Sequence, residues 1–330
     1  MAVGANAFDA DGSGARAQSG RLRRLTEELA DEGFSIDLDD TAGAVLLEEL
    51  DYALRPAVHE RRVPSFGAIL APTRESADWE AATELTVTHR NLDGVPLVDA
   101  RRFADGLSSW LVRRDDGLEL AVFDRPAGSE RDLVVMAEAM GATIVQRHPS
   151  GLVRIVGSFG VLRWDGLQWH REPPVAAWID EMSACSVHGD RAVVGRLLEF
   201  AVHDLGARNI GALLIYQPSD EVSPTFELRL AEPPTLRITS AADLAPLRHV
   251  LAQIDGAAVF DVGGVLRQLG VRLVPSAAAE ADVDGLRGMR HTSARRYSFD
   301  DSNATVIVVS EDGPVTVMRN GEVLGRSEGT

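Results

Sequence analysis

The chain has 330 residues, and 33 Lys and Arg against 50 Asp and Glu give a formal net charge of −17. Hydrophobic residues make up 45% of it and charged residues 25%, an ordinary globular composition that excludes wholesale disorder. The acidic balance argues against general DNA or RNA binding, because phosphate neutralisation needs a basic face, but it allows a small anion held by a local arginine cluster.

Several sequence features bear on the compartment. No apolar run approaches the roughly 18–20 residues of a membrane helix, so we expect no membrane association. The first residues lack a basic stretch followed by an apolar one, which argues against secretion. The one cysteine, Cys185, allows neither an intramolecular disulfide nor a thiolate zinc cluster. We therefore expect a cytoplasmic protein, and the length predicts two domains.

The first half of the chain alternates helix and strand patterns after a polar tail. Residues 1–20 are rich in Gly, Ala, Ser and Asp and predict a disordered tail. Leucines at three- and four-residue steps then predict mainly helix to about residue 59. The remaining pattern predicts a helix at 131–140 and strands at 66–71, 118–123, 142–146, 152–156 and 160–164. Such alternation is typical of an α/β or α+β domain, which we place at 21–172.

A proline pair marks the boundary to the second half. Arg171-Glu-Pro-Pro174 is the best candidate for a domain junction, because two prolines continue neither a helix nor an internal strand. Beyond it, the apolar pattern predicts helices at 192–205 and 242–254 and strands at 210–216, 257–260, 305–309 and 315–318. The second half is therefore also α/β in pattern.

A weak internal sequence similarity links the two halves. A helix followed by Pro64-Ser-Phe-Gly67-Ala-Ile-Leu-Ala-Pro72 parallels a helix followed by Asn209-Ile-Gly211-Ala-Leu-Leu-Ile-Tyr-Gln-Pro218. Two interpretations stay open. One is a true internal duplication, and the other, which is the more common case, is the general likeness of helix-then-strand units.

Two short segments of the second half carry residues suited to metal and phosphate chemistry. Asp255-Gly256-Ala257 stands between a helix and a strand, where glycine allows close approach of a ligand and an aspartate can hold a divalent metal. Ser310-Glu311-Asp312-Gly313 closes an apolar strand, where carboxylates often line a crevice. The alternative for both segments is a plain turn with its polar residues in water.

The densest segment spans 285–296 and reads Gly-Leu-Arg-Gly-Met-Arg-His-Thr-Ser-Ala-Arg-Arg. Its arginines can each bind a phosphate through two hydrogen bonds. Gly288 before Arg290-His291-Thr292-Ser293 predicts a turn into a helix N-terminus, where backbone N–H groups attract anions. The alternative, slightly favoured by composition alone, is a solvated basic helix face that pairs with the acidic remainder.

A set of motifs follows one another in a characteristic order: Asn209-Ile-Gly-Ala-Leu-Leu-Ile, Asp255-Gly-Ala, Leu273-Val-Pro, Gly288-Met-Arg-His-Thr, Val308-Val-Ser-Glu-Asp-Gly and the run 315–321. In order and spacing they resemble the DisA-type nucleotide-binding domain of diadenylate cyclases, over roughly residues 183–326. The resemblance implies a mixed β-sheet flanked by helices. It also implies two such domains facing each other, each with one ATP and a divalent metal (Mg²⁺ or Mn²⁺), which form cyclic di-AMP and two pyrophosphates.

The resemblance also implies roles for single residues. Asp255 would bind the metal near the attacking 3′-hydroxyl, and Arg290 and His291 would hold the phosphates. Leu273 would pack on adenine. The other positions implied to contact the nucleotide or complete the metal and phosphate surroundings are Gly256, Ala257, Gly288, Thr292, Ser293, Ser310, Glu311 and Asp312.

The sequence departs from the family pattern Gly-Thr-Arg-His-Arg at two positions. Met289 replaces the threonine and Thr292 replaces the second arginine, so the phosphate cradle loses a hydroxyl and a guanidinium. Arg295 or Arg296 could replace the lost charge. The sequence thus leaves open an active cyclase that works as a homodimer or larger homo-oligomer, a degenerate nucleotide-binding sensor that does not cyclise, and, less favoured, a scaffold.

Overall fold

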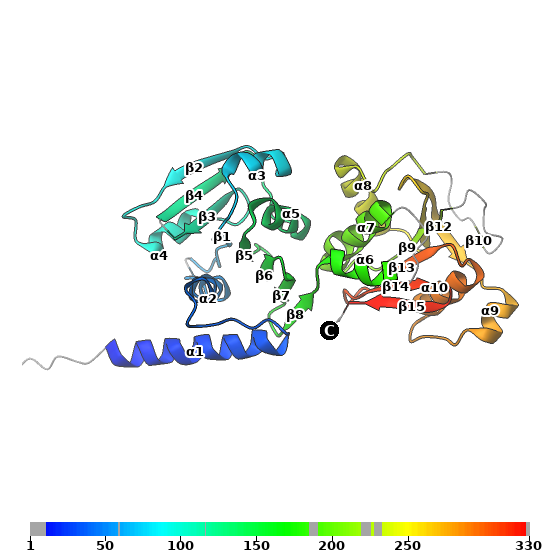
Figure 1. Ribbon diagram of the computed structural model, residues 1–330, viewed down its shortest axis with the longest axis horizontal. Helices are drawn as coiled ribbons and strands as arrows, with labels where there is room; N and C mark the ends of the chain where they lie inside the picture. The colour runs from blue at the N-terminus through cyan, green and yellow to red at the C-terminus, as the bar shows by residue number, and fades with distance from the viewer. Residues whose placement is uncertain are drawn as a thin grey trace, which may run out of the picture. The chain divides into compact units, whose positions relative to one another are not determined.

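The computed structural model describes residues 11–58, 60–115, 117–184, 191–218, 226–227 and 233–327, and Cys185 lies outside them. The chain divides into two compact units, Met1–Arg171 and Glu172–Thr330 (Figure 1). Each unit contains one mixed sheet flanked by helices, so the expected fold class is confirmed. None of the described helices is both long enough and apolar enough to cross a membrane.

The first unit starts with two helices, α1 (Asp11–Asp31) and α2 (Thr41–Leu54), and Asp40 caps α2 by accepting a hydrogen bond from the Gly43 N–H. The expected tail is corrected here: residues 11–20 are helical, and residues 1–10 lie outside the described residues. The physical reason is that Ala15, Arg16 and Ala17 are strong helix formers that extend the leucine-bearing helix toward the N-terminus.

The first sheet lies between two helical layers. Its strands are β1 (Phe66–Leu70), β2 (Val87–Asn91), β3 (Ser109–Arg114), β4 (Gly117–Phe123), β5 (Thr143–Arg147), β6 (Val153–Gly157), β7 (Gly160–Trp164) and β8 (Trp169–Glu172), in the order β2-β4-β3-β1-β5-β6-β7-β8. The remaining helices are α3 (Ser76–Thr83), α4 (Leu97–Ala100), the 3-10 helix η1 (Arg101–Phe103) and α5 (Glu130–Met140). Ala68 joins a core with α1 and α2, whereas the next residue, Ile69, joins a core with α3 and α5.

The second unit repeats this layering. Its helices are α6 (Val175–Ala184), α7 (Arg191–Glu199), the π-helix η2 (Phe200–Leu205), the 3-10 helix η3 (Gly206–Arg208), α8 (Ala241–Leu251), α9 (Ala277–Asp282) and α10 (Met289–Asp300). Its strands are β9 (Ala212–Tyr216), β10 (Phe226–Glu227), β11 (Ala257–Phe260), β12 (Leu266–Leu273), β13 (Thr305–Val309), β14 (Val315–Arg319) and β15 (Glu322–Arg326). Their order is β10-β12-β11-β9-β13-β14-β15.

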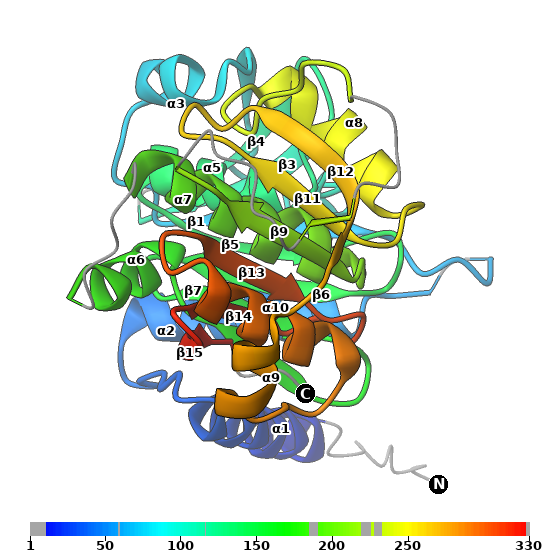
Figure 2. The ribbon, with the colours of Figure 1, turned by 90° about the vertical axis from the view of Figure 1, so that its right-hand side faces the viewer.

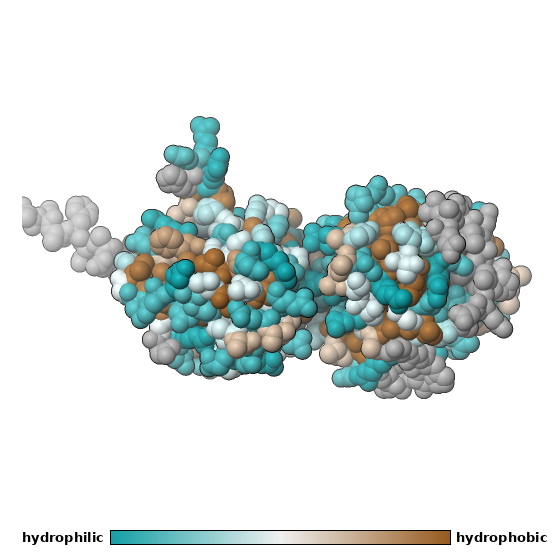
Figure 3. Space-filling view, turned by 90° about the horizontal axis from the view of Figure 1, so that it is seen from above, coloured by the Kyte–Doolittle hydropathy of each residue, from teal (hydrophilic) through white to brown (hydrophobic). Residues whose placement is uncertain are grey.

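The sheet of the second unit also separates two cores. Leu214 packs with α7, η2 and α8, whereas its neighbour Leu213 packs with Ala294 and Tyr297 of α10. Figure 2 shows α10 in front of β13 and β14, with α9 beside it. Seen in the direction of Figure 3, the surfaces of both units are mainly hydrophilic with small hydrophobic patches, as expected when each unit buries its own cores.

The two sheets share one topology over the seven strands of the second. Matching β1 with β9, β2 with β10 and β3 to β7 with β11 to β15 reproduces the strand pairings of the second sheet, including the parallel pair, which is β1–β3 in the first sheet and β9–β11 in the second. The hairpin loops 148–152 and 310–314 carry the same two backbone hydrogen bonds, and each has a glycine with positive φ, Gly151 at 95° and Gly313 at 105°. The weak sequence similarity between 64–72 and 209–218 thus coincides with a structural repeat, because these segments contain the equivalent strands β1 and β9.

Candidate functional site

The sequence-predicted motifs of the second unit gather at one edge of its sheet. Strands β9 and β11 run parallel and β13 runs antiparallel to β9, so the starts of β9 and β11 share an edge with the end of β13. Asp255 lies two residues before the start of β11, and Ser310 directly follows β13. Helix α10, which carries Arg290 and His291, packs on β13 and β14 (Figure 2).

Arg290 is held between α10, β9 and the loop after β13. Its Nη1 lies 3.5 Å from the Val309 carbonyl oxygen, and its Nη2 lies 3.9 Å from Glu311 Oε1. Gly211 makes room for this arrangement, because a Cβ at that position would lie 2.5 Å from Arg290 Nη1 and 2.7 Å from Glu311 Cγ. The Arg290 side chain is 35% exposed, so the guanidinium is positioned yet open to an anion.

His291 sits beside two further strands of the sheet. Its Nε2 lies 3.4 Å from Oγ1 of the buried Thr316 on β14. Burial lowers the pKa of His291 first, the charges of Arg326 and Arg290 lower it further, and Asp312 opposes them. These surroundings favour the neutral imidazole, whereas a phosphate bound beside it would favour the protonated form.

Asp255 and Gly256 form an exposed corner before β11. Gly256 has a φ of 104°, and a Cβ there would lie 2.7 Å from the carbonyl carbon of Gly270, so the position requires glycine. Among the described residues, no group of three or more His, Cys, Asp or Glu side chains could hold a metal ion. Asp255 therefore fits Mg²⁺ or Mn²⁺ only in a site completed by nucleotide phosphates and water, the usual arrangement for Mg²⁺.

Several other predicted site residues are buried or have a role in the local backbone structure. Ala257 is fully buried, and Leu273 is 8% exposed at the end of β12, which leaves little of its side chain open to adenine. Gly288, with φ 98°, is the N-cap of α10. Ser293 on α10 and Ser310 after β13 are half-buried, and the Ser310 N–H donates to the Pro314 carbonyl.

The residues around the altered motif are engaged with the backbone. Thr292 Oγ1 lies 3.0 Å from Leu286 N and 2.9 Å from its carbonyl oxygen, so this side chain fastens the loop before α10. Arg295 donates to the carbonyl oxygens of Gly321 and Asp284, and Arg296 donates to that of Val283. Arg295 and Arg296 are thus bound to backbone carbonyls, and these contacts give no support to either as the substitute for the guanidinium that is missing at Thr292.

Three residues of this edge received no role in the sequence analysis: Gly211, Thr316 and Arg326. Gly211 and Thr316 lie within two of the quoted motifs. Gly211 could have been found, because a glycine directly before a buried strand often marks a close approach. Arg326 carries no local signal, and nothing within the run 315–321 singles out Thr316. They reach His291 only because β14 and β15 pair with Thr316 opposite Arg326.

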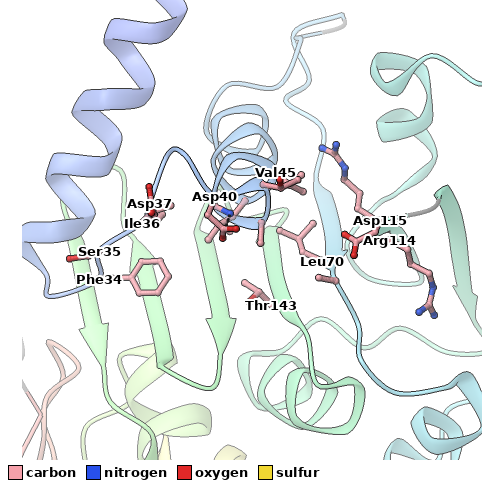
Figure 4. Close-up of a pocket in the computed structure, with 16 residues that line it drawn as sticks. Phe34, Ser35, Ile36, Asp37, Asp40, Val45, Leu70, Arg114, Asp115 and Thr143 are labelled. Atoms are coloured by element: carbon pink, nitrogen blue, oxygen red, sulfur yellow. Dashed lines mark hydrogen bonds between the residues drawn. The ribbon is translucent and has the colours of Figure 1, made fainter.

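The first unit contains a cavity of about 690 Å³ that none of the predicted site residues lines. It lies beside the start of α2 and the carboxyl ends of the parallel strands β1 and β3. Figure 4 shows Phe34, Val45, Leu70 and Thr143 around one space, with Asp115 at its margin. Its volume is typical of small-molecule sites, and the carboxyl ends of parallel strands commonly bind ligands. The residues that line the cavity come from four separate segments of the chain, so no single sequence motif indicates the cavity.

Two family models match the chain, one in each unit. Residues 23–172 match the family model "Probable sensor domain DACNK", and residues 199–323 match the model "DisA bacterial checkpoint controller nucleotide-binding", abbreviated DAC. No curated protein matches the chain.

Two solved structures resemble part of the chain. One is a hypothetical membrane spanning protein from Bacillus cereus, with 18% identity, a TM-score of 0.30, and coverage of 43% of this chain and 72% of that one. The other is a double mutant of DacA from Staphylococcus aureus, with 20% identity, a TM-score of 0.26, and coverage of 46% and 87%. Residues 199–323 of this chain thus match a nucleotide-binding domain of the DAC family.

Proposed function

We propose that the chain is a diadenylate cyclase that joins two ATP molecules into cyclic di-AMP and releases two pyrophosphates. The observation that carries the proposal is the meeting of three motifs, far apart in sequence, at one edge of the second sheet: the Asp255 corner, the start of α10 and the end of β13. The DAC match of residues 199–323 supports adenine nucleotide binding there.

The residues of this edge suit phosphoryl transfer, in which positioning and charge neutralisation do most of the work. Arg290 would grip a phosphate with the N–H donors that face the open side of the site. His291 would donate a ring N–H to a phosphate oxygen while its Nε2 stays near Thr316. Asp255 would hold Mg²⁺ or Mn²⁺ together with the phosphates, and the ion would neutralise their charge.

The reaction requires two domains. In each half, a bond forms between the 3′-oxygen of one ATP and the α-phosphorus of the other, and the bond from that phosphorus to pyrophosphate breaks. One domain presents one nucleotide, so we infer a homodimer or larger assembly in which two sites face each other. The rate per protomer should therefore rise with protein concentration until the assembly saturates.

The first unit would regulate this reaction. Its match to a sensor domain and its cavity beside β1 and β3 support a role in binding a small molecule. The cytoplasm, where ATP is available, is the compartment that we propose for the chain.

The direct test compares Asp255→Asn with Asp282→Asn in the full chain. Both carboxylates are exposed, so neither change should unfold the protein, and Asp282 at the end of α9 serves as the control. We expect Asp255→Asn to abolish formation of cyclic di-AMP from ATP and Mn²⁺ and to weaken metal-dependent ATP binding, whereas Asp282→Asn keeps both. Unchanged activity of Asp255→Asn would remove this residue from the mechanism.

A further inference from the structure

The repeated topology identifies equivalent positions in the two units. The two hairpin loops of equal length align Arg147 with Val309 and Val153 with Val315, since each pair closes its loop. One residue further from the loop, three residues lie opposite one another on neighbouring strands. They are Gln146, Arg154 and Arg163 in the first unit and Val308, Thr316 and Arg326 in the second. Arg326 on β15 is thus the counterpart of Arg163 on β7.

In the first unit, the arginine at this position binds an anion at a helix N-terminus. Arg163 donates from Nε to Glu130 Oε2 at 2.7 Å and from Nη2 to Oε1 at 2.6 Å. Arg154 Nε lies 3.4 Å from the same carboxylate. Glu130 is the first residue of α5, and its side chain is fully buried. An arginine at this strand position therefore has the reach and direction to grip a carboxylate-sized anion at the start of the crossing helix.

In the second unit, the start of α10 meets the same strand positions. His291 in its first turn contacts Thr316, the counterpart of Arg154, and lies close enough to Arg326 for that charge to lower the His291 pKa. Helix α10 begins with Met289, which is 89% exposed, instead of an acidic residue. Arg326 is itself exposed, and within the described residues it forms no ion pair. Its charge therefore acts on the first turn of α10, which corresponds to the place where an anion is held in the first unit.

We propose that Arg326 binds the polyphosphate of the nucleotide and supplies the guanidinium that the altered motif lacks at Thr292. The inference rests on the proposed function, because it places ATP at the start of α10. It also explains why Thr292 can serve the loop before α10 and why Arg295 and Arg296 can hold backbone carbonyls.

The test measures binding of ATP, ADP and AMP by calorimetry to the full chain and to Arg326→Ala, Arg326→Lys and Arg196→Ala. Arg196 is an exposed arginine on α7, which covers the opposite face of the sheet, so its removal controls for loss of one positive charge. Arg326 is exposed, so its variants should keep the melting temperature of the wild type, which is checked in parallel.

We expect Arg326→Ala to weaken ATP binding by about 10- to 100-fold, the range for loss of a charged hydrogen-bonding partner, and to change AMP binding by less than about threefold. Arg326→Lys should give an intermediate loss, because it keeps the charge but not the planar fork. ATP affinity of Arg326→Ala equal to that of Arg196→Ala would overturn the inference.

The two proposals fail separately. A wild-type chain that forms cyclic di-AMP while Arg326→Ala binds ATP normally would refute only the role of Arg326. A wild-type chain that binds ATP and loses that binding in Arg326→Ala, but forms no product, would refute only the cyclase. Absence of ATP binding to the wild type would refute both.

Discussion

Gly211→Ala perturbs the site through a single methyl group. The added Cβ would lie 2.5 Å from Arg290 Nη1, whereas ordinary van der Waals contact begins at 3.4 Å, so the guanidinium must move by about 0.9 Å. Misplacement of a catalytic group by about 1 Å can reduce activity about 100-fold. We therefore expect kcat/KM for cyclic di-AMP formation to fall by roughly 10- to 100-fold. Stability should fall little, because the clash involves a partly exposed side chain that can swing away.

The assay is a double-mutant cycle of Gly211→Ala with Arg290→Ala, measured as kcat/KM and as ATP affinity. If the methyl group acts by displacing Arg290, Gly211→Ala should cost little in a chain that already lacks this guanidinium. Gly263→Ala is the control, since its Cβ would have its nearest contact at 3.4 Å and φ there is not positive. Losses that simply add in the double variant, or a Gly211→Ala chain with wild-type activity, would refute this reasoning.

Three further predictions concern both units. Glu130→Gln should destabilise the first unit by about 3–5 kcal/mol in chemical denaturation, because it removes the buried carboxylate that pairs with Arg163. The exposed Glu138→Gln on the same helix should change stability by less than about 0.5 kcal/mol. Thr292→Arg, with or without Met289→Thr, should lower cyclase activity, because it removes the hydroxyl that fastens the loop before α10; a gain in activity would show that the loop is not needed. His291 has a lowered pKa in the free chain, and a bound phosphate should raise that pKa, so ATP should bind more tightly as the pH falls from the higher of these two pKa values to the lower. The proton taken up on binding should appear as a binding heat that depends on the buffer. An ATP affinity that does not change with pH in this interval would contradict the prediction.

Much of the fold could be predicted from local pattern. The apolar runs that became β1, β9 and β13 are buried at every position, and buried strands of this kind are the easiest to recognise. Strand β2, in contrast, has no buried residue and β15 has few apolar ones, so neither stood out. The helix expected over 192–205 is present, but it changes to the π-helix η2 at Phe200, which no propensity scale indicates.

The candidate site was predictable to the extent that its residues sit in short motifs. Asp255, Arg290 and Ser310 are each local to a turn or helix start, and the topology brings their segments to one edge. Arg326 could not be found in this way, because its approach to His291 depends on the register of β14 against β15. Arg295 and Arg296, the two replacements that the sequence suggested, are closer to Thr292 in sequence. On α10, however, their side chains donate to backbone carbonyls of neighbouring loops.

The most direct measurement of the cyclase proposal is the product analysis of the purified full chain incubated with ATP and Mn²⁺, by chromatography and mass spectrometry, over a series of protein concentrations. We predict cyclic di-AMP and pyrophosphate in a ratio of one to two, with a rate per protomer that rises with concentration and no product from Asp255→Asn. Measurable binding of ATP without cyclic di-AMP at any protein concentration would contradict the cyclase and leave a nucleotide-binding sensor.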